Sequence, residues 1–298
     1  MATVGSKIEP PPEWMKIRLK FATPEADQAG PVRELVNRSR VATVCEEASC
    51  PNLSHCWSRG SATFMIMGER CTRRCKFCDV ATARPDALDP DEPRRLAETI
   101  RDMRLKHAVI TSVDRDDLKD CGSTHFAAVI RAVRAASPDT TIEVLIPDFK
   151  GRLENLERIW AEGPHIINHN VETVPSLYKT ICPQSNYGVS LDVLRLSAER
   201  GFHTKSGIIL GLGETLEEVR AEMSELRQNR VEMLTIGQYL QPTPEHAPVM
   251  AYIPPEVFEE LKTFGYELGF RHVESGPLVR SSFHAGDAVD KILSSPVS

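Results

Sequence analysis

Two groups of three cysteines lie close together in the first third of the chain. The upstream group has the spacing C-x4-C-x5-C and consists of Cys45, Cys50 and Cys56. The downstream group, in "CTRRCKFC", has the spacing C-x3-C-x2-C and consists of Cys71, Cys75 and Cys78. Clustered cysteines bind zinc or iron–sulfur clusters, and four ligands are the usual number for either. The spacing therefore predicts two metal centres, each of which needs one ligand from elsewhere.

Iron–sulfur clusters suit these cysteines better than zinc does. Structural zinc sites are closed four-ligand sites, usually built from paired C-x2-C motifs, and neither group has that form. His55 could complete a zinc site with the upstream group, but it adjoins Cys56, and adjacent residues rarely point at one ion. A four-iron cube binds thiolates at several corners, and an iron without a thiolate can take another ligand. An iron–sulfur electron carrier or a zinc-folded binding module is the non-enzymatic alternative.

The composition of the chain excludes several classes of protein. With 298 residues, of which 41% are apolar, the chain can build a sizeable globular core. A net charge of −6 provides no basic face with which to neutralise nucleic-acid phosphates. No apolar stretch reaches the roughly 20 residues of a membrane span, and the first residues have neither a secretory signal nor a transit peptide. We expect a cytoplasmic monomer with no nucleic-acid or membrane partner.

Six β-rich runs alternate with helical patterns after about Ser61. The runs cover residues 62–68, 107–113, 141–147, 166–172, 203–210 and 232–240. Apolar residues at helical spacing follow each run, such as Leu96, Ile100 and Met103 after the first. Thr215 and Glu218 form a predicted capping box at the start of the fifth helix. Six such units predict an α/β fold with a parallel sheet.

The parallel sheet is either an open doubly wound sheet or a partial (β/α)6 barrel, TIM-like but with six repeats. In both folds, ligands bind at the carboxyl ends of the strands, and the downstream cysteines directly follow the first strand. We expect this α/β unit to cover residues 61–270. Residues 1–60 would form an N-terminal extension that carries the upstream cysteines, and residues 271–298 a C-terminal extension.

The downstream cysteine loop resembles that of the radical S-adenosylmethionine (SAM) enzymes, because Phe77 precedes the last cysteine and the loop follows the first strand. Over nearly its whole length the chain resembles the lipoyl synthases. The segments that carry this resemblance are "CEEASCPNLSHCW" (45–57), "GERCTRRCKFCDV" (68–80), "TSVDRDDLKDCGSTHF" (111–126), "NHNVET" (168–173), "KSGIILGLGET" (205–215), "TIGQYLQPT" (235–243) and "SGPLVRSSFHA" (275–285).

The resemblance implies a fold, an activity and a set of cofactors. The fold would be the partial (β/α)6 barrel of the radical SAM type. The activity would be that of a sulfurtransferase, which inserts sulfur at C6 and C8 of an octanoyl chain held on a lysine of a lipoyl carrier domain. The cofactors would be SAM and two [4Fe–4S] clusters. The cluster on the downstream cysteines would generate radicals, and the auxiliary cluster on the upstream cysteines would be consumed as the sulfur donor.

The resemblance also implies a fourth ligand for the auxiliary cluster. In the family, a serine of the tail motif R-S-S-Y-x-A binds this cluster, and we assign Ser282 as the ligand, with Ser281 as the second choice. Phe283 stands where the family has tyrosine. The expected partners are the E2 subunits of 2-oxoacid dehydrogenases or the glycine cleavage H protein, and an electron donor such as ferredoxin or flavodoxin.

Five residues are candidate contacts for SAM. The run "GIILGLGE" fits the superfamily pattern G-x-I-x-G-x-x-E, but it can also be read as a buried strand that turns into a helix. Ser112 follows the second strand, with Asp114 and Arg115 beside it, where relatives hold the methionyl group. Asn170 and the carboxylate of Glu172 follow the fourth strand and suit the ribose hydroxyls. The candidates are Ser112, Asn170, Glu172, Ile209 and Gly211.

Other reactive residues have less specific interpretations. Lys205 and Arg280 could neutralise cofactor charge or form ordinary ion pairs. The basic residues of the cluster loop, Arg70, Arg73, Arg74 and Lys76, could offset the negative charge of a cluster. Cys121 and Cys182 belong to neither group and are expected to be ordinary structural residues. No general base is assigned. A second enzyme hypothesis keeps the radical chemistry but makes the auxiliary cluster a permanent electron conduit.

Overall fold

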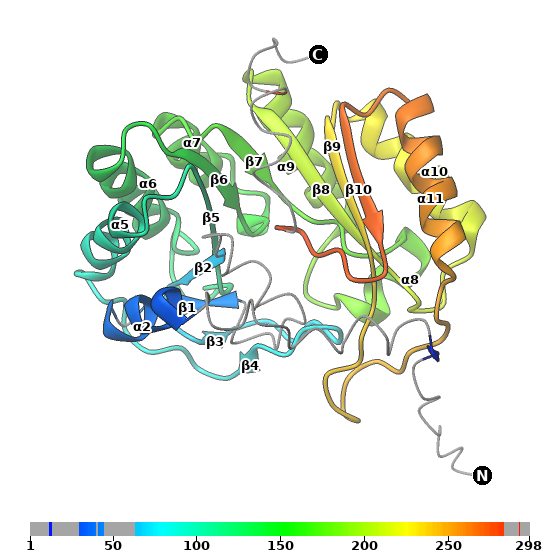
Figure 1. Ribbon diagram of the computed structural model, residues 1–298, viewed down its shortest axis with the longest axis horizontal. Coiled ribbons are helices and arrows are strands. Elements are labelled where there is room, and N and C mark those ends of the chain that lie inside the picture. The colour runs from blue at the N-terminus through cyan, green and yellow to red at the C-terminus, as the bar shows by residue number, and fades with distance from the viewer. Residues whose placement is uncertain (1–11, 14–29, 40, 45–62, 283–291, 293–298) are drawn as a thin grey trace.

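One eight-stranded sheet forms the centre of the molecule (Figure 1). The computed structural model describes residues 12–13, 30–39, 41–44, 63–282 and 292. In spatial order, which is also chain order, the strands are β1 (Ala42–Thr43), β2 (Thr63–Ile66), β5 (His107–Ser112), β6 (Thr141–Leu145), β7 (Ile166–Asn168), β8 (His203–Leu210), β9 (Met233–Gln238) and β10 (His272–Gly276).

The strand order identifies the fold as a partial barrel. Strands β2 to β10 are parallel to their neighbours, and only β1 pairs antiparallel, with β2. A doubly wound sheet reverses its strand order at a switch point, but this order never reverses. Successive right-handed crossovers therefore place the helices on one side, and the sheet curls. No pairing among the described strands joins β1 to β10, so the barrel is open there.

Helices cover the outer side of the curved sheet (Figure 1). They are α2 (Gly30–Ser39), α5 (Glu92–Asp102), α6 (Ser123–Ala136), α7 (Leu153–Ala161), α8 (Pro175–Ile181), α9 (Tyr187–Glu199), α10 (Leu216–Gln228) and α11 (Pro255–Glu267). The predicted apolar stripes face the sheet, and Leu96 and Ile100 of α5 are fully buried. The predicted capping box at Thr215 and Glu218 is present.

Among the elements that the sequence pattern did not indicate are helix α8 and the strands β1 and β10. The short helix α8 lies between β7 and α9, and begins at Pro175, a residue suited to a first helical turn. Strands β1 and β10 form the two edges of the sheet, and both fall in segments that the sequence assigned to the terminal extensions. The sheet thus extends beyond residues 61–270 at both ends of the chain.

A buried ion pair decides between the two interpretations of Lys205. Its Nζ donates to Glu143 Oε1 at 2.9 Å, and both side chains are almost completely buried. The other carboxylate oxygen of Glu143 lies 3.0 Å from His107 Nε2. Burial alone would raise the pKa of Glu143, but Lys205 and His107 outweigh it and lower that pKa to about 2. Lys205 is therefore an ion-paired structural residue.

Candidate functional site

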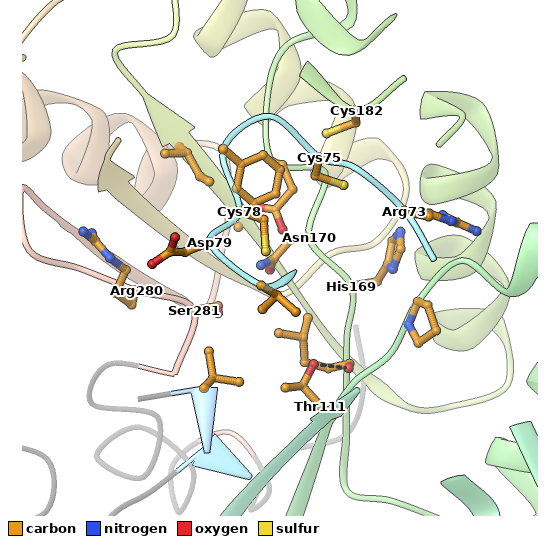
Figure 2. Close-up of a pocket in the computed structure, with 18 of the residues that line it drawn as sticks. Arg73, Cys75, Cys78, Asp79, Thr111, His169, Asn170, Cys182, Arg280 and Ser281 are labelled. Atoms are coloured by element: carbon orange, nitrogen blue, oxygen red, sulfur yellow. Dashed lines mark hydrogen bonds between the residues drawn. The ribbon is translucent and has the colours of Figure 1, made fainter. Parts of the chain in front are cut away.

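A cavity of about 590 Å³ opens at the carboxyl ends of the strands. Its walls come from the loop after β2, from the ends of β5 to β9 and from the tail segment Val279–Ser282 (Figure 2). The sequence-predicted residues on these walls are Cys71, Cys75, Cys78, Ser112, Asn170, Glu172, Ile209 and Ser282. Cys45, Cys50 and Cys56 lie outside the described residues. The structure therefore brings together eight candidates that are spread over more than half of the chain.

The cluster loop, residues 71–78, is held by backbone contacts. It runs between two short parallel strands, β3 (Arg70–Cys71) and β4 (Ala81–Thr82). The backbone N–H groups of Arg73 and Asp114 donate to Cys71 Sγ at 3.4 and 3.3 Å. Donors of this kind stabilise a thiolate. These two donors lower the pKa of the Cys71 thiol, but the opposing effect of burial is larger.

The cavity cysteines keep their protons in the absence of a positively charged ligand. Burial raises the pKa of Cys71 to about 11, with the Asp114 carboxylate adding to the effect, and raises that of Cys78 to about 12. Bound iron reverses this preference, because a coordinating thiol loses its proton. Within the described residues, no three His, Cys, Asp or Glu side chains converge on a single metal ion. A four-iron cube differs from a single-ion site, because its thiolates bind separate irons.

Arg73 is a buried anchor of the cluster loop rather than a source of free positive charge. Its side chain is 4% exposed, and its guanidinium bonds Asp148 at 2.6 and 2.8 Å and Asp116 at 2.9 and 3.1 Å. Asp114 Oδ1 lies 3.3 Å from Arg73 Nε. Three carboxylates therefore surround one cation. The expectation that Arg73 offsets cluster charge is wrong for this reason.

Cys182, expected to be an ordinary structural residue, lies on the cavity wall. Figure 2 shows Cys182 next to Cys75 of the cluster loop. Cys182 directly follows α8, the helix that the sequence pattern did not reveal. Without that helix, the sequence contained no signal that placed Cys182 beside the cluster loop. Cys121, by contrast, is buried in the core away from the cavity.

Two polar atoms of the candidate SAM contacts lack hydrogen-bond partners among the described residues. Within the described part of the chain, Ser112 Oγ and Asn170 Oδ1 are buried and accept or donate no hydrogen bond. Buried polar atoms require partners, so these two indicate a polar ligand. Gly207 makes room for Asn170, since a Cβ there would lie 2.8 Å from Asn170 Oδ1.

Glu172 reaches the cavity from an uncommon backbone conformation. Its φ is 68°, a left-handed value that most side chains avoid, and its backbone bridges to Ile208 of β8. Burial raises the pKa of Glu172 to about 7, while a hydrogen bond from Asn170 opposes that shift. A polar ligand with hydroxyl donors would favour the ionised carboxylate.

The two predicted residues of the glycine-rich run have different environments. Ile209 is half-buried on the cavity wall. Gly211 is not among the wall residues, and its role is conformational. Its φ is +99°, and a Cβ would lie 2.4 Å from the carbonyl oxygen of Ala251. Glu214 accepts hydrogen bonds from the N–H groups of Gly211 and Leu212, so it stabilises this turn.

The tail crosses the open side of the barrel and reaches the first parallel strand. Gly237 of β9 allows the tail to pass, because a Cβ there would lie 2.2 Å from the carbonyl oxygen of Val279. The hydroxyl of Thr63, on β2, donates to Ser282 Oγ at 2.6 Å. Ser281 also lines the cavity, beside Arg280 (Figure 2). Phe283 lies outside the described residues.

Comparisons with known proteins agree with this geometry. The model of the Radical SAM superfamily matches residues 65–226. A lipoyl synthase of Leptospira interrogans is 51% identical over 278 residues, which cover 93% of this chain and 92% of that protein. A lipoyl synthase of Stutzerimonas stutzeri is 52% identical over 277 residues, with coverages of 92% and 84%.

Solved structures with low sequence identity share the fold. Methylornithine synthase superimposes with a TM-score of 0.54 at 12% identity, covering 87% of this chain and 80% of that one. HydG, a maturase of the [FeFe]-hydrogenase, gives a TM-score of 0.53 at 15% identity, with coverages of 92% and 74%. At such identities the likeness is one of fold alone. None of the described helices is long and apolar enough to cross a membrane.

Proposed function

The chain belongs to the lipoyl synthase family within the radical SAM superfamily, and from this we infer that it is a sulfurtransferase. The reaction inserts two sulfur atoms, at C6 and C8, into an octanoyl chain carried by a lysine of a carrier protein. Its cofactors are SAM and two [4Fe–4S] clusters. The observation that carries the proposal is the shared cavity, whose walls contain the downstream cysteines and the tail serine Ser282.

In this proposal, Cys71, Cys75 and Cys78 hold the radical-generating cluster and leave one iron open for SAM. When bound, this pair supplies a 5′-deoxyadenosyl radical, which is chemistry of the cofactor rather than of the chain. The protein contributes the three half-buried thiols on the cavity wall and the two N–H donors to Cys71 Sγ. Arg73 fixes the loop that carries these thiols.

We assign the SAM contacts to the opposite wall of the cavity. Ser112 and Asn170 offer polar atoms that lack protein partners, and Glu172 offers a carboxylate suited to the two ribose hydroxyls. Ile209 provides an apolar surface beside the adenine. Gly211 is proposed to act only through the turn that it permits.

The auxiliary cluster is assigned to Cys45, Cys50, Cys56 and Ser282. Ser282 Oγ already lies at the cavity, where Thr63 donates to it, so an oxygen ligand can be directed there without a long movement of the tail. An oxygen ligand is harder than a thiolate and is displaced more easily from iron, which suits a cluster that gives up sulfur. Ser281 is the alternative ligand.

The physiological partners are proposed at the level of chemical class. The substrate is an octanoylated carrier, for which the E2 subunits of 2-oxoacid dehydrogenases and the glycine cleavage H protein are the candidates. Ferredoxin or flavodoxin would supply the electrons. A cytoplasmic location and a monomeric state stay predictions.

An anaerobic assay with SAM, a reductant and an octanoylated lipoyl domain tests the function. Reconstituted protein should contain about eight irons per chain, as expected for two cubes. It should convert the octanoyl group to a lipoyl group and lose its auxiliary cluster during turnover. Cleavage of SAM with the octanoyl group left unsulfurated would contradict the proposal. An auxiliary cluster that stays intact through turnover, with no sulfur inserted, would favour the electron-conduit alternative.

Variants of the two ligand sets should have different phenotypes. Cys45→Ala and Ser282→Ala should still cleave SAM but form no lipoyl product, because only the auxiliary cluster loses a ligand. Cys75→Ala should lose both activities. Ser281→Ala is the matched control for the tail and should retain both. If Ser281→Ala and Ser282→Ala exchange phenotypes in assays of iron content and product, the ligand is Ser281 instead.

A further inference from the structure

The cluster loop forms one wall of the cavity, and this wall has an outer face. Cys75 lines the cavity, whereas its neighbours Arg74 and Lys76 are exposed and are not among the wall residues. The side chains on either side of Cys75 therefore face away from the cavity. A protein bound to that outer face would be separated from the proposed cluster by little more than the loop itself.

Hydrogen bonds join the loop to a neighbouring segment on each side. At the end of α8, the carbonyl of Ile181 accepts from Lys76 N at 2.8 Å. In the loop that follows β9, Ala247 N donates to Lys76 O at 2.9 Å, and His246 Nε2 lies 3.0 Å from Cys78 O. An acyl-lysine arm needs an open channel, whereas an electron can cross a packed wall. This face therefore suits an electron donor better than it suits the carrier protein.

The outer face is positively charged, although the chain as a whole has a net charge of −6. Arg74 and Lys76 are exposed, and so is Lys179 in the last turn of α8. Within the part of the chain that the structure describes, none of the three forms an ion pair. Across the sequence of the cluster loop, α8 and the loop after β9, Glu245 is the only acidic residue. The local charge thus favours a negatively charged partner.

Rigid apolar residues lie beside these charges. Pro183 follows α8, Pro244 and Pro248 belong to the loop after β9, and all three are exposed. Met250, in the same loop, is 63% exposed. A proline ring already fixes φ, so these residues lose little conformational freedom when a partner binds. Unpaired charges beside a small apolar rim are typical of the small, transient interfaces of electron-transfer complexes.

We propose that Arg74, Lys76 and Lys179 form the docking surface for an acidic one-electron carrier protein of the flavodoxin or ferredoxin class. The inference rests on the proposed function, in which the downstream cysteines hold the radical-generating cluster. In the docked complex, one electron passes from the reduced flavin or iron–sulfur centre of the carrier to this cluster. The carrier is oxidised, the cluster is reduced, and no covalent bond changes in this step.

The test measures the Kd of the holoenzyme for an oxidised flavodoxin and for an oxidised ferredoxin, by anaerobic calorimetry at low and high salt. The reversal variant combines Arg74→Glu, Lys76→Glu and Lys179→Glu. At low salt its Kd should be about tenfold higher than that of the wild type, or more. The wild type should lose affinity as salt is added, because salt screens exposed charges, and the variant should not.

The matched control reverses three charges at the opposite end of the barrel. It combines Arg104→Glu, Lys106→Glu and Arg230→Glu, which are exposed positions before β5 and β9. Its net charge equals that of the reversal variant, and its Kd should equal that of the wild type. A second readout separates docking from chemistry. With dithionite, a small reductant, the reversal variant should cleave SAM at the wild-type rate, but with flavodoxin as the only donor it should be slower.

Each result decides the inference. An unchanged Kd in the reversal variant would overturn it, and so would equal weakening in the control or a wild type that binds neither carrier. Weaker binding of an octanoylated lipoyl domain, with flavodoxin and ferredoxin binding unchanged, would make the substrate carrier the partner and overturn it too. If the reversal variant loses iron, the neutral variant Arg74→Gln, Lys76→Gln and Lys179→Gln decides by the same comparison. Because Kd is measured without turnover, a wild type that forms no lipoyl product contradicts the proposed function alone.

Discussion

Single residues inside the cavity have functions that their charge or type alone does not reveal. The sequence showed four basic residues in the cluster loop, and only contacts distinguish them. Arg73 is buried among Asp114, Asp116 and Asp148, whereas Arg74 is exposed. The three cysteines of the cluster loop, by contrast, are predicted as ligands from their spacing alone, and that assignment stays a prediction. The place of Cys182 on the cavity wall could not be predicted, because the cluster loop is distant from it in sequence.

Replacement of Arg73 should weaken the cluster loop. Arg73→Met leaves three buried or half-buried carboxylates without their cation, and breaking a buried ion pair in this way costs about 3–5 kcal/mol. We expect a lower iron content after reconstitution and a lower thermal midpoint. Arg74→Met removes the same charge from the same loop and should have little effect. Equal losses of iron in both variants would attribute the effect to net charge instead.

Secondary structure elements explain which parts of the fold the sequence could predict. The six parallel strands and the apolar stripes of their helices repeat a strong pattern, so the parallel sheet was predictable, whereas the choice of a barrel over a doubly wound sheet came from the family resemblance. Strand β10, "HVESG", alternates buried and half-buried residues and lacks the continuous apolar run of a central parallel strand. Helix α8 has only seven residues, too few for a recognisable stripe. Both were missed because edge strands and short helices depend on tertiary contacts.

Helix α10 contains a buried carboxyl that predicts how stability depends on pH. Glu222 is 1% exposed, and neither of its oxygens has a partner within the described residues. Burial raises its pKa from 4.5 to about 8, and nearby carboxylates, chiefly that of Glu225, add to this shift. Between these two pKa values the folded protein binds a proton that the unfolded chain does not. The free energy of unfolding should therefore fall as the pH rises.

Glu222→Gln should flatten that dependence. One such proton changes the free energy of unfolding by about 1.4 kcal/mol per pH unit. The wild type should lose thermal stability between pH 5 and pH 8, and the variant should lose less. The measurement is the thermal midpoint at a fixed scan rate under anaerobic conditions. Glu217→Gln, at an exposed position of the same helix, is the control. Parallel curves for wild type and Glu222→Gln would contradict the assignment.

At the scale of the whole molecule, the tail connects the two edges of the sheet. It leaves β10 at one edge, passes Gly237 of β9, and reaches Thr63 of β2 near the other edge. The sequence motif predicted a serine ligand, but not the path that brings it to the cavity. That path depends on Gly237 in β9. The reason for a glycine at this position becomes clear only from the structure, in which the tail crosses β9.

Gly237→Ala should displace the tail without disturbing the cluster loop. The added methyl group would lie 2.2 Å from the carbonyl oxygen of Val279, a distance that real Cβ atoms do not tolerate. We expect iron content to fall from about eight to about four per chain, with SAM cleavage retained and lipoyl formation lost. Gly188→Ala, in helix α9, meets no closer atom than Asn186 Oδ1 at 3.4 Å and is the control. Full iron content in Gly237→Ala would show that the tail can take another path.

The bond between Thr63 and Ser282 also sets an order of events during synthesis. Its partners are 219 residues apart, which corresponds to about 10–45 s of translation at about 5–20 residues per second. Strand β2 is therefore synthesised long before Ser282, which bonds to its first residue. During that interval the open side of the barrel stays accessible, and a chain that stops early never acquires this contact. The contact that brings Ser282 to the cavity therefore forms only after residues 61–270 have been synthesised.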